Sequence, residues 1–143
     1  MKSLIGEYTH NIDSKRRVFI PSGLRVSKNW VVTMGFENCL FLFPEKEWES
    51  ITEKIKASPL TKKDTRNFFR LFLSQARALQ LDGQGRILIP ESLGAHSGLK
   101  KSCVFVGMLN RVEIWEPGRW REFLQTREGS FTDMAENITG IDF

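Results

Sequence analysis

Short apolar runs separated by turn residues recur along the chain and predict strands joined by tight turns. Two pairs of runs each flank a Gly-x-x-Asn segment, followed in the second pair by Arg111, which is the pattern of a hairpin. The pairs are residues 31–34 with 39–43, and residues 104–106 with 112–115. After each pair, apolar residues return at helical spacing and predict a helix with one packed face. They are Trp48, Ile51 and Ile55 in the first half and Trp120, Phe123 and Leu124 in the second.

The chain contains an internal repeat. The segment IDSKRRVFIP (12–21) aligns with LDGQGRILIP (81–90) at an offset of 69 residues, with Asp, Arg and Pro in the same places. Further along, Trp48 aligns with Trp120 at an offset of 72, and an insertion of three residues before Cys103 accounts for the change. Each copy therefore predicts a strand, a tight loop, a strand, a short helical turn opened by proline, a hairpin and a helix.

The repeat divides the chain into four segments. We expect a first repeat over 6–58, a connecting helix over 59–75, a second repeat over 76–126 and a flexible tail over 127–143. Such short strands cannot bury their apolar faces as isolated hairpins, so the two repeats are predicted to pair in one body. The connecting helix is apolar nearly all round, which predicts that both repeats or a neighbouring subunit cover it. Its apolar residues are Phe68, Phe69, Leu71, Phe72 and Leu73.

The composition favours a folded protein without catalytic or metal chemistry. Of the 143 residues, 41% are hydrophobic and 27% are charged, as in ordinary folded chains. Cys39 and Cys103 lie in apolar runs and form no C-x-x-C pair, so buried reduced thiols are favoured over a disulfide or a metal site. His10 and His96 lie far from any cluster of cysteines or acidic residues, so no metal and no cofactor are expected. Motifs for a nucleophile, a phosphate loop or a paired acid are missing from the sequence, which argues against an enzyme.

No apolar run approaches the roughly 18 residues that a membrane helix needs. The first eleven residues also lack the apolar centre of a secretory signal. We therefore expect a cytoplasmic protein with no membrane partner and no small-molecule substrate.

Positive charge is concentrated in the first half of the chain. The whole sequence has a formal net charge of +4 and a pI near 9.3. Residues 1–72 contain thirteen Lys and Arg against eight Asp and Glu, whereas residues 73–143 contain eight against nine. Such one-sided positive charge attracts the phosphate backbone of nucleic acids, although charge placed for solubility explains a net charge this small equally well.

The aligned Asp-x-x-x-Arg segments predict loops whose conformation the aspartate fixes. Asp13 is able to accept backbone N–H bonds across its own loop, and Arg17 is placed either to pair with it or to reach outward. Residues 13–17 contain one carboxylate and three cations, whereas residues 82–86 contain one of each, so only the first loop is predicted to seek phosphate. The candidate DNA contacts are Ser14, Lys15, Arg16 and Arg17, with Arg25 and Lys28 either extending the footprint or facing water. A structural role is assigned to Asp13, Asp82, Gly85 and Arg86.

The tandem motif resembles the MraZ family of bacterial regulators, in the AbrB-like swapped-hairpin superfamily. The similarity covers about residues 6–124. It rests on both Asp-x-x-x-Arg units, RILIP (86–90), LFLFP (40–44) followed by Trp48, and PLTKKD (59–64) ahead of an aromatic helix. The resemblance implies an α+β, β-rich fold in which tandem swapped-hairpin repeats form one barrel-like body with flanking helices.

The same resemblance implies a function. It indicates a ring-like homo-oligomer that binds repeats in double-stranded promoter DNA through Lys15, Arg16 and Arg17 and regulates transcription of the division and cell-wall gene cluster. Repetition around a ring multiplies weak contacts by avidity. The protein would then be cytoplasmic and associated with the nucleoid. Two alternatives remain open, namely an antitoxin-like module that binds another protein and a ring with a structural role.

The sequence departs from the family pattern at Arg16, where the family has glycine, as this chain has at Gly85. Glycine suits a loop position with positive φ, and another residue there costs roughly 1 kcal/mol or more. Either the loop has another conformation or the cost is accepted. Arg16 then either adds a phosphate contact or reflects drift in a tolerant loop.

Overall fold

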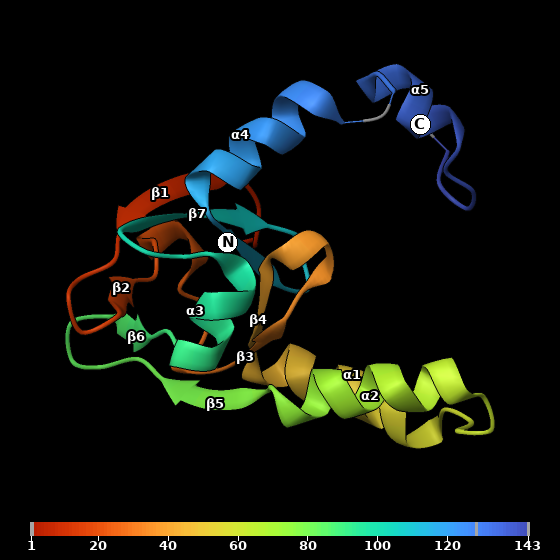
Figure 1. The fold of residues 1–143 in the computed structure, drawn as a ribbon, viewed down its shortest axis with the longest axis horizontal. Helices are drawn as coiled ribbons and strands as arrows, with labels where there is room; N and C mark the ends of the chain where they lie inside the picture. Colours follow the sequence, from red (N-terminus) through yellow and green to blue (C-terminus); the bar gives the residue numbers. More distant parts are fainter. Residues whose placement is uncertain (1, 128, 143) are drawn as a thin grey trace.

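The computed structural model describes residues 2–127 and 129–142 and has a strand-rich α+β fold with the predicted order of elements in each repeat (Figure 1). The strands are β1 (Glu7–Asn11), β2 (Arg17–Phe19), β3 (Asn29–Met34), β4 (Leu40–Pro44), β5 (Arg77–Gln80), β6 (Arg86–Leu88), β7 (Ser102–Gly107) and β8 (Val112–Trp115). The helices are α1 (Glu45–Ala57), α2 (Lys63–Ser74), α3 (Glu91–Ser97), α4 (Pro117–Thr126) and α5 (Phe131–Glu136), with 3-10 turns at Ser22–Leu24 and Phe36–Asn38. Pro21 and Pro90 stand directly before the first 3-10 turn and α3, as the sequence predicts.

The two repeats exchange their first hairpins. Strand β1 of the first repeat pairs with β7 of the second, and β5 of the second repeat pairs with β3 of the first. Strands β2 and β6 pair with each other as a separate two-stranded ribbon, in which Val18 lies opposite Ile87. These two residues occupy the same place in the aligned repeats, so the ribbon has an approximate twofold axis between them. The predicted pairing of the repeats in one body is confirmed.

The larger sheet is open. Its six antiparallel strands follow the order β1-β7-β8-β4-β3-β5, so β1 and β5 form its edges. The family resemblance implies a barrel-like body, but the ribbon remains a second sheet in the described part of the chain and closes no barrel. The reason is that β2 and β6 are only three residues long and direct their ladder hydrogen bonds to each other.

Apolar residues of both repeats bury the two faces of the larger sheet. One face packs against the ribbon and α3, and Trp30 and Phe105 lie there in one cluster with Val18 and Ile87. The other face carries an aromatic cluster that includes Phe41, Phe43, Phe72 and Trp115, with Trp48 and Trp120 packed against it. Every residue of β4 is buried, because successive side chains of this central strand enter opposite clusters. The ribbon therefore rests on a packed base made by both repeats.

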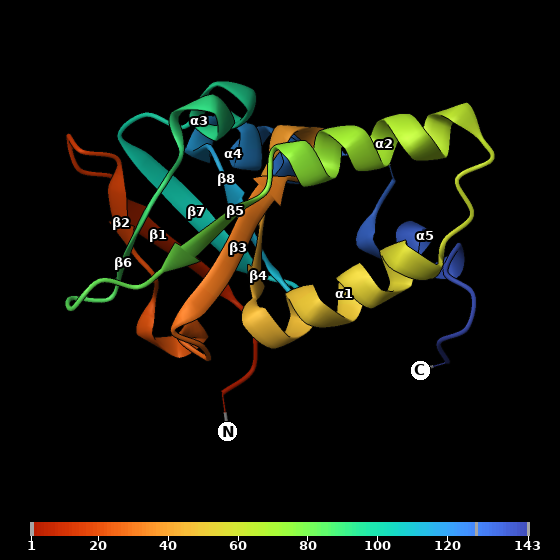
Figure 2. The ribbon, with the colours of Figure 1, turned by 90° about the horizontal axis from the view of Figure 1, so that it is seen from below.

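Helix α2 is covered on one side only. It extends from the body toward the same side as α1 (Figure 2), and the Thr33 hydroxyl of β3 donates a buried hydrogen bond of 2.6 Å to the carbonyl of Phe72. Phe72 is buried, but Phe68, Leu71 and Leu73 are 42%, 57% and 41% exposed. Within one chain, residues of both repeats cover the side of the helix at Phe72, since Phe41 and Trp115 lie in the same cluster, and the opposite side stays exposed. Cover by a neighbouring subunit stays a prediction.

The C-terminal segment 127–143, predicted to be a flexible tail, contains the short helix α5. Ser130 caps it, since its hydroxyl accepts the backbone N–H of Asp133 and the Asp133 carboxylate accepts the backbone N–H of Ser130. Glu128 and Phe143 of this segment lie outside the described residues. Over residues 2–127 and 129–142, none of the helices is both long enough and apolar enough to span a membrane.

Candidate nucleic-acid interface

The first Asp-x-x-x-Arg loop is closed by hydrogen bonds to Asp13. Its Oδ1 accepts the backbone N–H groups of Lys15 and Arg17, each at 2.9 Å, and its Oδ2 accepts Nε–H of Arg17 at 2.8 Å. Two backbone bonds complete the loop, from Arg16 to the Asp13 carbonyl and from Asp13 to the Arg17 carbonyl. The backbone N–H of Arg17 is the main cause that lowers the pKa of Asp13. The carboxylate is thus ionised at neutral pH and holds the loop in one conformation.

The second loop repeats the same set of bonds. Asp82 accepts the backbone N–H groups of Gln84 and Arg86 at 2.9 Å and Nε–H of Arg86 at 2.8 Å. The backbone N–H of Arg86 is the main cause that lowers the pKa of Asp82 to about 2. Both loops therefore share one hydrogen-bonded conformation, and they differ in the side chains at their tips.

Arg16 adopts the left-handed backbone conformation that Gly85 has in the second loop. Its φ is 61°, and that of Gly85 in the second loop is 85°. Of the two alternatives left by the sequence, the loop therefore keeps its conformation, and Arg16 accepts a cost of roughly 1 kcal/mol. Its Nε–H donates a hydrogen bond of 3.2 Å to the carbonyl of Ile89 in the second repeat. The first loop is thus tied to the other repeat through its tip.

The tip of the first loop presents Ser14, Lys15 and Arg16 to solvent. Figures 1 and 2 show that both loops project from the same end of the molecule, opposite the turn that joins α1 to α2. With Arg17, the first loop carries three cations against the single carboxylate of Asp13, a formal charge of +2. A projecting loop with this charge suits contact with phosphate groups.

The outward face of the ribbon brings both motif arginines onto one surface. Val18 and Ile87 are buried beneath it, and strand alternation turns the flanking side chains outward. These outward residues are Arg17, Phe19, Arg86 and Leu88. The Arg86 guanidinium lies over the Phe19 ring, 5.8 Å from its centre. A hollow of about 420 Å³ opens beside them and is lined by His10, Asn11, Asp13, Arg17, Phe19 and Arg86.

Arg25 and Lys28 lie beside the second loop, not the first. The Lys28 carbonyl accepts the backbone N–H of Leu81, which leads into the second loop. Nε–H of Arg25 donates to the Ile20 carbonyl at 2.7 Å, and its guanidinium packs against Gly85. They lie there because the repeats exchange hairpins. The Arg25 guanidinium adds a cation at the tip of the second loop, which the sequence predicts to be neutral.

The backbone of Lys101 lies beside the start of the first loop, which the sequence alone does not predict. Its carbonyl accepts the backbone N–H of Ile12 at 2.8 Å, as the Lys28 carbonyl does for Leu81. Each loop is thus entered next to a lysine from the other repeat. The signal in the sequence is a lysine directly before the third strand of each repeat, and only the strand exchange shows which loop it joins. Arg86 and Phe19 are also missed as members of this surface.

The remaining candidate residues show no reactive arrangement. Cys39 and Cys103 are buried free thiols, as predicted, and burial raises the pKa of each to about 12. Among the residues that the structure describes, no three metal-ligating side chains of His, Cys, Asp or Glu gather in one place.

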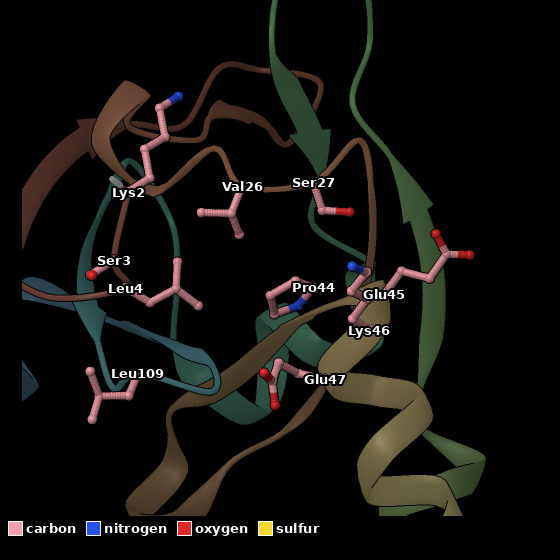
Figure 3. A pocket seen from close by; sticks show the side chains of 10 residues that line it. All are labelled: Lys2, Ser3, Leu4, Val26, Ser27, Pro44, Glu45, Lys46, Glu47 and Leu109. Atoms are coloured by element: carbon pink, nitrogen blue, oxygen red, sulfur yellow. The ribbon is translucent and has the colours of Figure 1, made fainter.

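A hollow of about 460 Å³ lies where the N-terminal segment meets the start of α1 (Figure 3). Leu4, Val26, Pro44 and Leu109 contribute apolar walls. Its charged lining residues are Lys2, Lys46, Glu45 and Glu47, so positive and negative charges balance. A balanced lining gives no preference for an anion, and we place the nucleic-acid interface on the loops and the ribbon.

The exchanged hairpins and the pair of aspartate-closed loops define the class of the protein, which is a tandem-repeat protein of the AbrB-like superfamily. The family model of MraZ proteins, described as antitoxin-like, matches residues 4–71 and 72–141, one match for each repeat. The chain belongs to the MraZ family. This confirms the resemblance found in the sequence and indicates, at family level, the role of a regulator and not that of an enzyme.

Proposed function

We propose that this protein is a sequence-specific DNA-binding regulator of transcription whose aspartate-closed loops contact the phosphate backbone. The observation that carries the proposal is the cluster of Lys15, Arg16 and Arg17 on a projecting loop fixed by Asp13. The Ser14 hydroxyl is a further hydrogen-bond donor to phosphate in the first loop. Arg25 and Lys28 supply phosphate contacts beside the second loop. Loops with a fixed conformation lose little conformational freedom when they bind DNA, which supports a role for them in phosphate contact.

The ribbon between the loops is proposed to face the base edges. Phosphate contacts fix the position of a protein on DNA, whereas sequence is read by groups that enter a groove. A two-stranded ribbon fits the major groove, and arginine is the commonest reader of guanine there. Arg17 and Arg86 lie on the outward face of the ribbon with Phe19 and Leu88. The nucleoid location follows from such binding.

The protein is proposed to act as a homo-oligomeric ring on repeats in promoter DNA. The exposed side chains of Phe68, Leu71 and Leu73 on α2 support contact between subunits, since apolar side chains gathered on one helix favour burial. Identical loops spaced around a ring would bind repeated sites with avidity. Resemblance to the family supports the division and cell-wall gene cluster as the target.

A DNA-binding titration tests the proposed loop. We expect a variant with Lys15, Arg16 and Arg17 all changed to Ala to bind the DNA upstream of its own gene far more weakly than the wild type. The slope of log K against log salt should fall by about 0.9 for each phosphate group that the variant no longer neutralises. Fluorescence anisotropy at several salt concentrations measures both quantities.

A matched control removes three cations from the opposite end of the molecule. Lys54, Lys56 and Arg70 are exposed on α1 and α2, and changing them to Ala alters the net charge by the same amount. The control should bind nearly as well as the wild type. Equal losses of affinity in both variants would show that net charge alone matters and would contradict a site on the loops.

The second candidate is an antitoxin-like module that binds another protein. It is favoured by the description of the matched family. If this alternative holds, the variant with Lys15, Arg16 and Arg17 changed to Ala would still bind the partner protein. The wild type would bind the DNA upstream of its own gene no better than random DNA.

A further inference from the structure

The two Asp-x-x-x-Arg loops lie at symmetry-related ends of the β2–β6 ribbon. The backbone N–H of Ile20 donates to the Gly85 carbonyl at 3.0 Å, and that of Ile89 donates to the Arg16 carbonyl at 2.8 Å. At the repeat offset of 69, Ile20 corresponds to Ile89 and Arg16 to Gly85. The same offset relates Arg25 to Gly94. Each end of the ribbon therefore contains one carbonyl and one loop tip in equivalent places, and Arg25, just after the 3-10 turn, aligns in the sequence with Gly94 inside α3.

At the end near the second loop, an arginine and a glycine fit together. Nε–H of Arg25 donates to the Ile20 carbonyl at 2.7 Å, and its guanidinium covers the loop tip at Gly85. A Cβ atom added to Gly85 would lie 2.6 Å from Cζ of Arg25 and 2.7 Å from its Nη1. The arginine therefore occupies the space that a side chain at the loop tip would need.

At the other end, the same two residue types have changed places. Gly94 stands where Arg25 stands in the first repeat and has no side chain to reach the Ile89 carbonyl. That carbonyl instead accepts Nε–H of Arg16 at 3.2 Å, from the loop tip. A Cβ atom added to Gly94 would meet no atom within 4 Å, so the space beside it is open.

We propose that Arg16 is a positioning residue that supplies, from the loop tip, the guanidinium that the second repeat lacks at Gly94. The loop tip and the helical turn have exchanged arginine and glycine between the two repeats. Each of the two carbonyls, of Ile20 and of Ile89, accepts a hydrogen bond from one guanidinium. The exchange accounts for a non-glycine residue at φ 61°. The primary role of Arg16 is then structural, because its side chain holds the first loop against the second repeat. This inference goes beyond DNA binding and does not depend on it.

A double-mutant cycle between positions 16 and 94 tests the exchange. In the wild type Arg16 already donates a hydrogen bond to the Ile89 carbonyl. Gly94→Arg should therefore leave Tm nearly unchanged, or lower it by crowding. In the Arg16→Gly background the same change should restore the arginine and glycine in the arrangement seen around Gly85. We expect Gly94→Arg to raise Tm by about 4 °C more in the Arg16→Gly background than in the wild type. Thermal unfolding at one fixed protein concentration measures the difference.

Two control pairs separate the exchange from other effects. Gly94→Ala improves helix propensity without a guanidinium, so it should change Tm equally in both backgrounds. In the Arg16→Ala background, the Cβ atom at position 16 blocks the guanidinium introduced at position 94. Gly94→Arg should therefore not raise Tm by the additional amount expected in the Arg16→Gly background. An equal effect of Gly94→Arg in the wild-type and Arg16→Gly backgrounds would overturn the inference. The cycle needs no DNA, so its outcome is independent of the proposed function.

Discussion

At the scale of single residues, Asp82 holds the second loop through one carboxylate. It accepts two backbone N–H groups and one guanidinium N–H, all within 2.9 Å. These bonds favour the ionised form, so the pKa of Asp82 falls from 3.8 to about 2. A pKa that is lower in the folded state adds stability that is present above the unfolded pKa and is lost as the pH falls toward the folded one.

We expect Asp82→Asn to lower Tm at neutral pH and to make Tm less dependent on pH in the acid range. Tm of the wild type should fall between about pH 5 and pH 2 as Asp82 becomes protonated, and part of that fall should be missing in the variant. Thermal unfolding followed by circular dichroism over this range measures the effect. Glu122→Gln, at an exposed position of α4, serves as the control. A variant curve parallel to that of the wild type would contradict this role of Asp82.

The sequence predicts the aspartate-closed loops because their bonds are local. Asp13 and Asp82 bond to groups two and four residues ahead, and this spacing is visible in the chain. The bond from Arg16 to Ile89 joins residues 73 apart and depends on the strand exchange. For the same reason the position of Arg25 and of the Lys28 backbone beside the second loop cannot be seen in the sequence.

At the scale of elements, the β2–β6 ribbon depends on one buried pair for its position. Val18 and Ile87 lie opposite each other beneath the ribbon and are almost fully buried. Each strand has only three residues, so few ladder bonds hold the ribbon by themselves. Packing of this pair on the larger sheet therefore fixes both loops.

We expect Ile87→Ala to destabilise the protein by about 3 kcal/mol, because it opens a cavity under the ribbon. Leu88→Ala, at the neighbouring outward position, should cost less than about 1 kcal/mol. Urea unfolding measures both free energies. Equal costs for the two variants would show that the ribbon does not depend on this buried pair.

Apolar patterning predicts the elements but not all of their partners. The strand runs, the proline-opened turns and the two long helices follow from local spacing. The open sheet does not follow, since alternation shows which side of a strand is buried and not which strand lies beside it. The exposed face of α2 is likewise unexpected, because an all-round apolar helix predicts burial without showing what covers it.

At the scale of the whole molecule, the exchange of hairpins makes the two repeats mutually dependent. Strand β1 lies at the edge beside β7, and β5 lies at the edge beside β3, so each repeat contributes a strand to the other. The ribbon also needs one strand from each. Neither repeat therefore contains a complete sheet of its own.

We expect the separate halves 1–75 and 76–143 to lack a cooperative unfolding transition, because each loses its exchanged strands. Mixing equal amounts should restore a transition and near-ultraviolet circular dichroism from the buried tryptophans. Cooperative unfolding of either half alone, with the same Tm as the whole chain, would contradict the exchange.

The proposed function requires the loops and the ribbon to bind one particular DNA sequence. The most direct measurement is the affinity of the wild type, at physiological salt, for the DNA upstream of its own gene and for a shuffled fragment of equal length and composition. We expect binding to the upstream fragment to be at least about a thousandfold tighter than binding to the shuffled one. Equal affinities for the two fragments would contradict it.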